Sequence, residues 1–118
     1  MALNVKYEVS DNIKEKALDA VEKARASGKI KKGSNEATKS LEKGNAKLVV
    51  VAEDVNPIEV VMHLPILCEE KGVACIPVKT KLELGTAAGL GVPCAAVAII
   101  DAGDGKDLVE EINKKLLK

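Results

Sequence analysis

The chain has 118 residues, a length that suits one domain with a single core, and we expect residues 1–118 to form that domain. Hydrophobic residues make up 47% and charged residues 31% of the chain, a balance that excludes a disordered protein. The formal net charge is zero, which argues against a protein that holds nucleic acid over a broad basic face, and Tyr7 is the only aromatic residue, which excludes base recognition by aromatic stacking.

The first expected element is an amphipathic helix. Asn12, with Glu15 three residues later, has the spacing of a capping box, and apolar residues then recur at helical spacing as far as Gly28. Residues 29–32 are too few for another helix, so they predict a short strand that leads into the next element.

The middle of the chain predicts two more helices around a buried strand. We expect a helix with Ser34 as its N-cap residue and Gly44 at its end. The continuous apolar run at 48–52 is typical of a strand buried on both faces. Residues 57–71 begin with a proline suited to the first position of a helix and predict a third helix, in which Pro65 should cause a kink or tighten a turn.

The last part of the chain continues the alternation of strands and helices. We expect a strand at 73–78, a short helix at 81–88 that Gly89 ends, a strand at 95–100 and a closing helix at 107–117. Alternating elements with short links predict the α/β class, as a three-layer α/β/α sandwich on a small central mixed sheet.

Positive charge gathers in one part of this neutral chain. Between residues 25 and 47 seven basic residues face two acidic ones, and the rest of the chain is acidic by the same excess. The basic residues are Arg25, Lys29, Lys31, Lys32, Lys39, Lys43 and Lys47, and the acidic ones are Glu36 and Glu42. Such a patch suits a compact nucleic acid that is recognised by its shape and a few base edges.

The segment Gly33-Ser34-Asn35-Glu36-Ala37-Thr38-Lys39 combines several groups that suit nucleic acid. A helix start offers open N–H donors to phosphate, and the preceding Lys32 adds charge. Asn35 and Lys39 lie one helical turn apart with Glu36 beside them, and these side chains can match the donors and acceptors of a base edge. We expect Thr38 to pack or to bond back within its own helix instead of reading a base. The alternative interpretation is an ordinary solvated helix face.

Four segments in this order carry a resemblance to a known family. They are Gly33-Ser34-Asn35-Glu36-Ala37-Thr38-Lys39, Leu48-Val49-Val50-Val51-Ala52-Glu53-Asp54, His63-Leu64-Pro65-Ile66-Leu67-Cys68 and Leu84-Gly85-Thr86-Ala87-Ala88-Gly89. Over nearly its whole length the chain resembles the "L seven Ae" family of archaeal large-subunit ribosomal proteins, which bind kink-turn RNA, and its eukaryotic relatives in the ribosome and the spliceosome.

The resemblance implies which residues read the RNA. In the family, the matching asparagine and glutamate contact the guanines of two adjacent sheared G·A pairs, and the matching lysine binds nearby. This implies base readout by Asn35, Glu36 and Lys39, with Lys32, Gly33 and Ser34 placing charge and backbone against the RNA.

A second RNA surface is also implied by the resemblance. Lys81 and the loop residues Leu90, Gly91 and Val92 match positions that contact the RNA bend and its extruded nucleotide in relatives, and so do Asn56 and Val60. Gly91 and Val92 replace the Ser-Arg of many eukaryotic relatives, which suggests a broader range of kink-turn targets. The alternative interpretation of this loop is a helix cap followed by a tight turn.

The implied function is that of a non-enzymatic protein that stabilises kink-turns. The implied RNAs are ribosomal RNA and the box C/D and H/ACA guide RNAs, with the RNA of ribonuclease P as a further candidate. The implied protein partners in guide particles are a Nop-domain protein and fibrillarin. No membrane and no small-molecule substrate is expected.

An alternative from another class is a receiver-like or metal-assisted phosphotransfer domain. Acids at the ends of predicted strands could meet a lysine and a hydroxyl at one sheet edge. These residues are Glu53, Asp54, Asp101, Lys79 and Thr80. Their order along the chain does not match a receiver domain, and no Ser, Cys or His has an activating partner at a fixed spacing, so we expect no enzyme.

The cysteines and the lone histidine predict no metal site. Cys68, Cys75 and Cys94 are odd in number and lack C-x-x-C spacing, so we expect buried thiols in a reducing compartment. His63, five residues before Cys68, lacks the paired spacing of a zinc site. No run of residues approaches the length of a membrane span, and we expect a soluble cytoplasmic protein with no cofactor.

Overall fold

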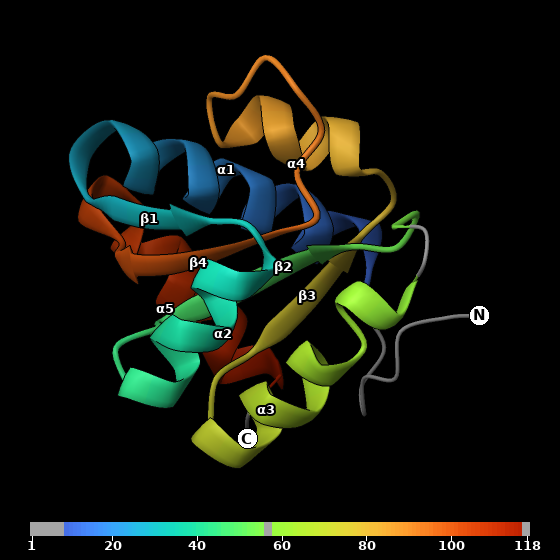
Figure 1. The fold of residues 1–118 in the computed structure, drawn as a ribbon. Helices are drawn as coiled ribbons and strands as arrows, with labels where there is room; N and C mark the ends of the chain where they lie inside the picture. The colour runs from blue at the N-terminus through green and yellow to red at the C-terminus, as the bar shows by residue number, and fades with distance from the viewer. Residues whose placement is uncertain (1–8, 56–57, 117–118) are drawn as a thin grey trace.

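The computed structural model describes residues 9–55 and 58–116, in which helices pack on both faces of a mixed sheet (Figure 1). The strands are β1 (Lys29–Lys32), β2 (Leu48–Ala52), β3 (Cys75–Val78) and β4 (Ala96–Asp101). The α-helices are α1 (Asp11–Ser27), α2 (Ser34–Lys43), α3 (His63–Lys71), α4 (Lys81–Ala87) and α5 (Lys106–Leu116), and the short 3-10 helices are η1 (Ile58–Val60) and η2 (Gly103–Gly105).

The strand directions decide which loops meet. The strand order is β1-β4-β2-β3, in which β2 and β3 are parallel and β4 runs antiparallel to both of its neighbours. The strands β1, β2 and β3 therefore point the same way. Their carboxyl ends and the amino end of β4 lie together at one edge of the sheet, which we call the carboxyl edge (Figure 1).

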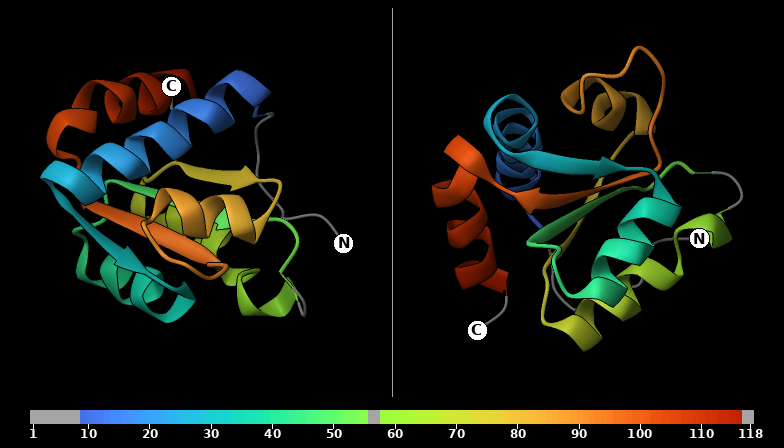
Figure 2. Two further views of the ribbon diagram at one scale, coloured as in Figure 1. Left: turned by 90° about the horizontal axis from the view of Figure 1, so that it is seen from above. Right: turned by 60° about the vertical axis from the view of Figure 1, so that its left-hand side comes forward.

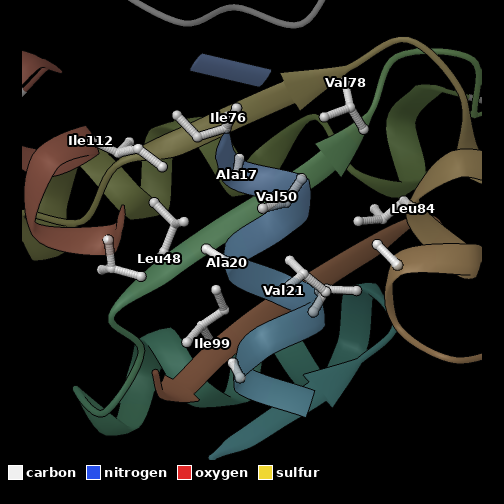
Figure 3. Packing of buried hydrophobic residues seen from close by; sticks show 14 of the residues in the cluster. Ala17, Ala20, Val21, Leu48, Val50, Ile76, Val78, Leu84, Ile99 and Ile112 are labelled. Carbon is white, nitrogen blue, oxygen red and sulfur yellow. The ribbon is translucent and has the colours of Figure 1, made fainter. Parts of the chain in front are cut away.

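The helices form two outer layers around the sheet. Buried residues of α1, α4 and α5 pack on one face, while those of α2 and α3 pack on the other (Figure 2). Figure 3 shows the first of these cores, where Val21, Leu84 and Ile112 come from three different helices. The predicted α/β/α sandwich with a small mixed sheet is confirmed.

Strand β2 lies at the centre of both cores. All five of its residues have an exposed fraction of zero, because its side chains alternate between the two faces. Leu48 and Val50 belong to the core under α1, whereas Val49 and Val51 belong to the core under α2. The predicted strand buried on both faces is confirmed.

The predicted capping box at Asn12 is wrong. Helix α1 begins one residue earlier, at Asp11, and the hydroxyl of Ser10 accepts a hydrogen bond from the Ile13 N–H at 3.3 Å. Ser10 has the extended backbone that an N-cap residue requires, whereas Asn12 already lies in the first helical turn.

The predicted continuous helix at 57–71 is also wrong, although its end is correct. Pro57 lies outside the described residues; after it come η1 and, from His63, helix α3. Pro65 is therefore the third residue of α3 instead of a mid-helix residue. Backbone N–H groups in a first turn have no intrahelical partner, so Pro65 fits there, and the kink predicted as one of two alternatives has no continuous helix in which to form.

The remaining boundaries agree with the sequence to within two residues. Gly44 and Gly72 follow α2 and α3 with φ values of 78° and 68°, the left-handed conformation that ends many helices. Among the described helices none combines the length and the apolar character needed to cross a membrane.

Candidate nucleic-acid interface

The start of helix α2 is shaped by a glycine in a rare conformation. Gly33 has φ 106° and ψ 153°, a region open essentially to glycine alone, and its carbonyl accepts from the Ala37 N–H at 3.0 Å. Ser34 was predicted as the N-cap residue, and this prediction is wrong. Ser34 is the first helical residue, because Gly33 turns the chain into the helix one position earlier.

The amino end of α2 consequently keeps open hydrogen-bond donors. Gly33 has no side chain to cap the helix, and within residues 9–55 and 58–116 no hydrogen bond uses the N–H groups of Ser34, Asn35 and Glu36, which lie at the positive end of the helix. Asn35 and Lys39 are exposed, Glu36 is half-buried, and Lys32 is exposed just before the turn. This end of α2 can therefore bind an anion while it presents an amide, a carboxylate and an ammonium.

Several hydrogen bonds hold this helix start in place. The Gly33 N–H donates to the carbonyl of Ala96 at 2.7 Å, which ties the turn to the amino end of β4. The Thr38 hydroxyl donates to the Ser34 carbonyl at 2.8 Å, so the predicted back-bond is confirmed. The same oxygen lies 2.7 Å from His63 Nε2, and since its proton is already used, His63 donates to it. The second turn of α2 and the first turn of α3 are thereby linked.

Lys81 and the loop before β4 reach the same edge of the sheet. The Lys81 carbonyl accepts from the Cys94 N–H at 2.9 Å, and its N–H donates to Asp54 Oδ1 at 2.7 Å. The loop is seated closely on α4, since a Cβ on Gly85 would come within 2.1 Å of the Val92 oxygen. At the loop tip, Val92 is 61% exposed, which is unusual for a large apolar side chain.

The carboxyl edge thus gathers most of the residues that the sequence analysis selected (Figure 1). Val60 follows β2 in η1 and is 42% exposed, and Asn56 lies outside the described residues. The others occupy the turn and first residues of α2, the start of α4 and the loop before β4: Lys32, Gly33, Ser34, Asn35, Glu36, Lys39, Lys81, Leu90, Gly91 and Val92.

Comparison with known proteins places this geometry in a family. Residues 15–109 match the model of the ribosomal protein L7Ae/L30e/S12e/Gadd45 family. The chain belongs to that family. Among solved structures it is similar to the Giardia lamblia 15.5kD RNA binding protein, with 34% sequence identity and a TM-score of 0.86 over 95% of this chain and 93% of that one.

The acidic residues of this family member do not form the site that the phosphotransfer alternative needs. Asp101 ends β4, which runs antiparallel to β2, so it lies at the opposite edge of the sheet from Glu53 and Asp54. Each acid has a local role instead: Glu53 pairs with Lys14 at 3.4 Å, and Asp101 Oδ1 accepts from the Gly103 N–H at 3.0 Å.

Two other residues of that alternative, Thr80 and Asp54, also have local roles. The Thr80 hydroxyl caps helix α4 by accepting from the Glu83 N–H at 3.1 Å, and Asp54 accepts from the first N–H of the same helix. No group of three or more His, Cys, Asp or Glu side chains within 9–55 and 58–116 could hold a metal ion. The geometric basis of the phosphotransfer interpretation is therefore wrong.

The cysteines lie in the cores of the protein and form no disulfide. Cys68 and Cys75 belong to the core between the sheet and helices α2 and α3. A hydrogen bond with Cys68, together with burial, raises the pKa of the Cys75 thiol well above its ordinary value. The Cys75 thiol is therefore a poor nucleophile, as expected for a residue that packs a core.

One basic residue beside the loop before β4 was not selected from the sequence. Arg25, in the last turn of α1, lies against Gly89 at the start of the loop before β4. In the sequence Arg25 is only one charge of the basic run, since nothing in its spacing links it to a loop more than sixty residues away.

Proposed function

We propose that this chain is an RNA-binding protein that recognises and stabilises kink-turns. The observation that carries the proposal is the carboxyl edge, where the uncapped start of α2 presents Asn35, Glu36 and Lys39 next to Lys81 and an exposed apolar loop. Membership of the L7Ae/L30e/S12e/Gadd45 family and the similarity to a protein named for RNA binding support it.

The readout would be specific for guanine. The Glu36 carboxylate can accept from both N1–H and the N2 amino group of guanine, a pair of donors that no other base presents together. Asn35 and Lys39 can donate to guanine O6 and N7. In regular A-form RNA these edges lie in a groove too narrow for side chains, so only a bent element with non-Watson-Crick pairs would offer them.

The remaining residues would bind the bend around these bases. Lys32 and the open N–H groups after Gly33 suit a phosphate, and Lys81 adds a second positive group from α4. Leu90, Gly91 and Val92, with Val60 and Asn56, would pack against the bend and its extruded nucleotide. Because the protein binds the bent form better, it draws a flexible internal loop into the kinked state without any catalytic step.

The proposal extends to the setting of this activity. We assign the chain to the archaeal large-subunit ribosomal branch of its family, as one domain spanning 1–118 that acts in the cytoplasm. Its RNAs would be ribosomal RNA and the box C/D and H/ACA guide RNAs, with ribonuclease P RNA as a further candidate. In guide particles the bound protein would form a platform for a Nop-domain protein and fibrillarin, which supply the modification chemistry.

The test compares two charged residues of the same helix. Glu36 lies in the first turn of α2, and Lys43 lies in its last turn, about 10 Å farther along the axis. Glu36→Ala should weaken kink-turn binding by about 1–3 kcal/mol and relax discrimination at one guanine, whereas Lys43→Ala should weaken binding to all RNAs slightly and equally. Equal behaviour of the two variants would show that α2 does not read bases.

A further inference from the structure

Arg25 is the only arginine of the chain, and its side chain is held against the loop before β4. A Cβ on Gly89 would come within 2.5 Å of Arg25 Cδ and 2.8 Å of Nε, so the side chain lies across a position that must lack a side chain. Gly89 also has a φ of 79°, which favours glycine for a second reason. The Arg25 side chain therefore lies at the base of the loop whose tip is Val92.

Among residues 9–55 and 58–116 no acidic side chain pairs with this guanidinium. Arg25 is exposed and makes no hydrogen bond or ion pair in the part of the chain that the structure describes, and Glu22, one turn earlier in α1, is not paired with it. The nearby acid Asp104 lies on the other side of α1, where its N–H donates to the Ser27 hydroxyl at 2.8 Å. Because Arg25 and Ser27 are two residues apart on α1, their side chains are separated by about 200° around the helix axis. Asp104, which contacts Ser27, therefore lies away from Arg25.

We propose that Arg25 binds a phosphate of the bound RNA at the rim of the interface, beside the Leu90–Val92 loop. This inference rests on the proposed function and extends its site beyond the carboxyl edge to the end of α1. A guanidinium matches phosphate with paired N–H donors, and the contact with Gly89 already restricts the side chain, so less conformational freedom is lost on binding. If Arg25 served only to complement the dipole of α1, RNA binding would not depend on it.

The experiment measures kink-turn RNA affinity over a range of salt concentrations for matched variants. Lys23→Gln is the control for Arg25→Gln, because Lys23 is an exposed cation of the same helix whose Cβ faces Gly105 and η2 on the other side. Arg25→Gln should weaken binding about three- to tenfold near 0.1 M salt and lower the salt slope by about 0.7–0.9, which corresponds to one phosphate contact. Lys23→Gln should change neither quantity, and Arg25→Lys should restore the slope.

Three outcomes would overturn the inference. The first is that Arg25→Gln behaves like Lys23→Gln. The second is that it weakens binding with an unchanged salt slope, which would make Arg25 a residue that positions the loop. The third is that the wild-type chain does not distinguish a kink-turn from the same RNA with its G·A pairs changed to Watson-Crick pairs. In that case the proposed function fails too, whereas in the first two cases it stands. Circular dichroism on each variant confirms that the helices are retained.

Discussion

Replacing Gly33 with alanine tests whether the start of α2 depends on a backbone conformation reserved for glycine. At φ 106° and ψ 153° a residue with a side chain is strained by about 1–3 kcal/mol. No atom of the described residues lies within 4 Å of the added Cβ, so no steric clash contributes. The lower entropy of the unfolded alanine chain offsets about 0.4–1 kcal/mol. We therefore expect Gly33→Ala to lower the free energy of unfolding by about 1–2 kcal/mol.

The assay is equilibrium unfolding in urea, followed by circular dichroism because the chain has no tryptophan. Gly91→Ala is the matched control, since Gly91 also has open space around its Cβ position but no positive φ, and its effect should stay within about 0.5 kcal/mol. Gly44→Ala, in the ordinary left-handed region after α2, should cost about 1 kcal/mol. If Gly33→Ala unfolds at the same urea concentration as Gly91→Ala, the strain argument is refuted.

Three further predictions concern the core, an ion pair and a thiol. Leu48→Ala should lower the free energy of unfolding by about 2–5 kcal/mol, because Leu48 is fully buried. Leu82→Ala, at a position that is 62% exposed, should change it by less than about 0.5 kcal/mol. Equal urea midpoints for the two variants would contradict the assigned core. The Lys16 ammonium bonds to Glu111 and lowers the pKa of the Glu111 carboxyl. This pair therefore stabilises the fold at pH values above the unfolded-state pKa of about 4.3. The stabilisation is lost as the pH falls through the lower pKa of the folded state. The stability difference between wild type and Glu111→Gln should thus shrink from pH 7 to pH 3, and a difference independent of pH would refute the pair. Because burial and its neighbour raise the pKa of Cys75, this thiol should react with a thiol reagent at pH 8 far more slowly in the native than in the unfolded protein, as mass spectrometry of the labelled residue can measure.

The order and type of the elements could be predicted because each carries a strong periodic signal. Strand β2 is an unbroken apolar run, and helix α2 ends at a glycine in the left-handed conformation. The residue types do not fix the helix starts, since residues one or two positions apart can each serve as the N-cap residue. Ser10 instead of Asn12, and Gly33 instead of Ser34, were decided by backbone angles that the residue types alone do not fix.

The candidate site also has a part that the sequence predicts and a part that only the fold shows. The segment from Gly33 to Lys39 is contiguous, so its residues had to lie together once the helix formed. The phosphotransfer alternative depended on strand direction, and only the antiparallel pairing of β4 showed that Asp101 is at the far edge. The contact of Arg25 with Gly89 joins α1 to the loop after α4, and such a long-range contact has no local signature in the sequence.

The most direct test of the central claim is a titration of the wild-type chain with two RNAs. One contains a kink-turn, and the other is the same RNA with its two G·A pairs changed to Watson-Crick pairs. If the chain recognises sheared G·A pairs, it should bind the first RNA tightly and the second weakly, with a shallow salt slope that corresponds to a few phosphate contacts. Equal binding to both RNAs, or binding to neither, would contradict this recognition.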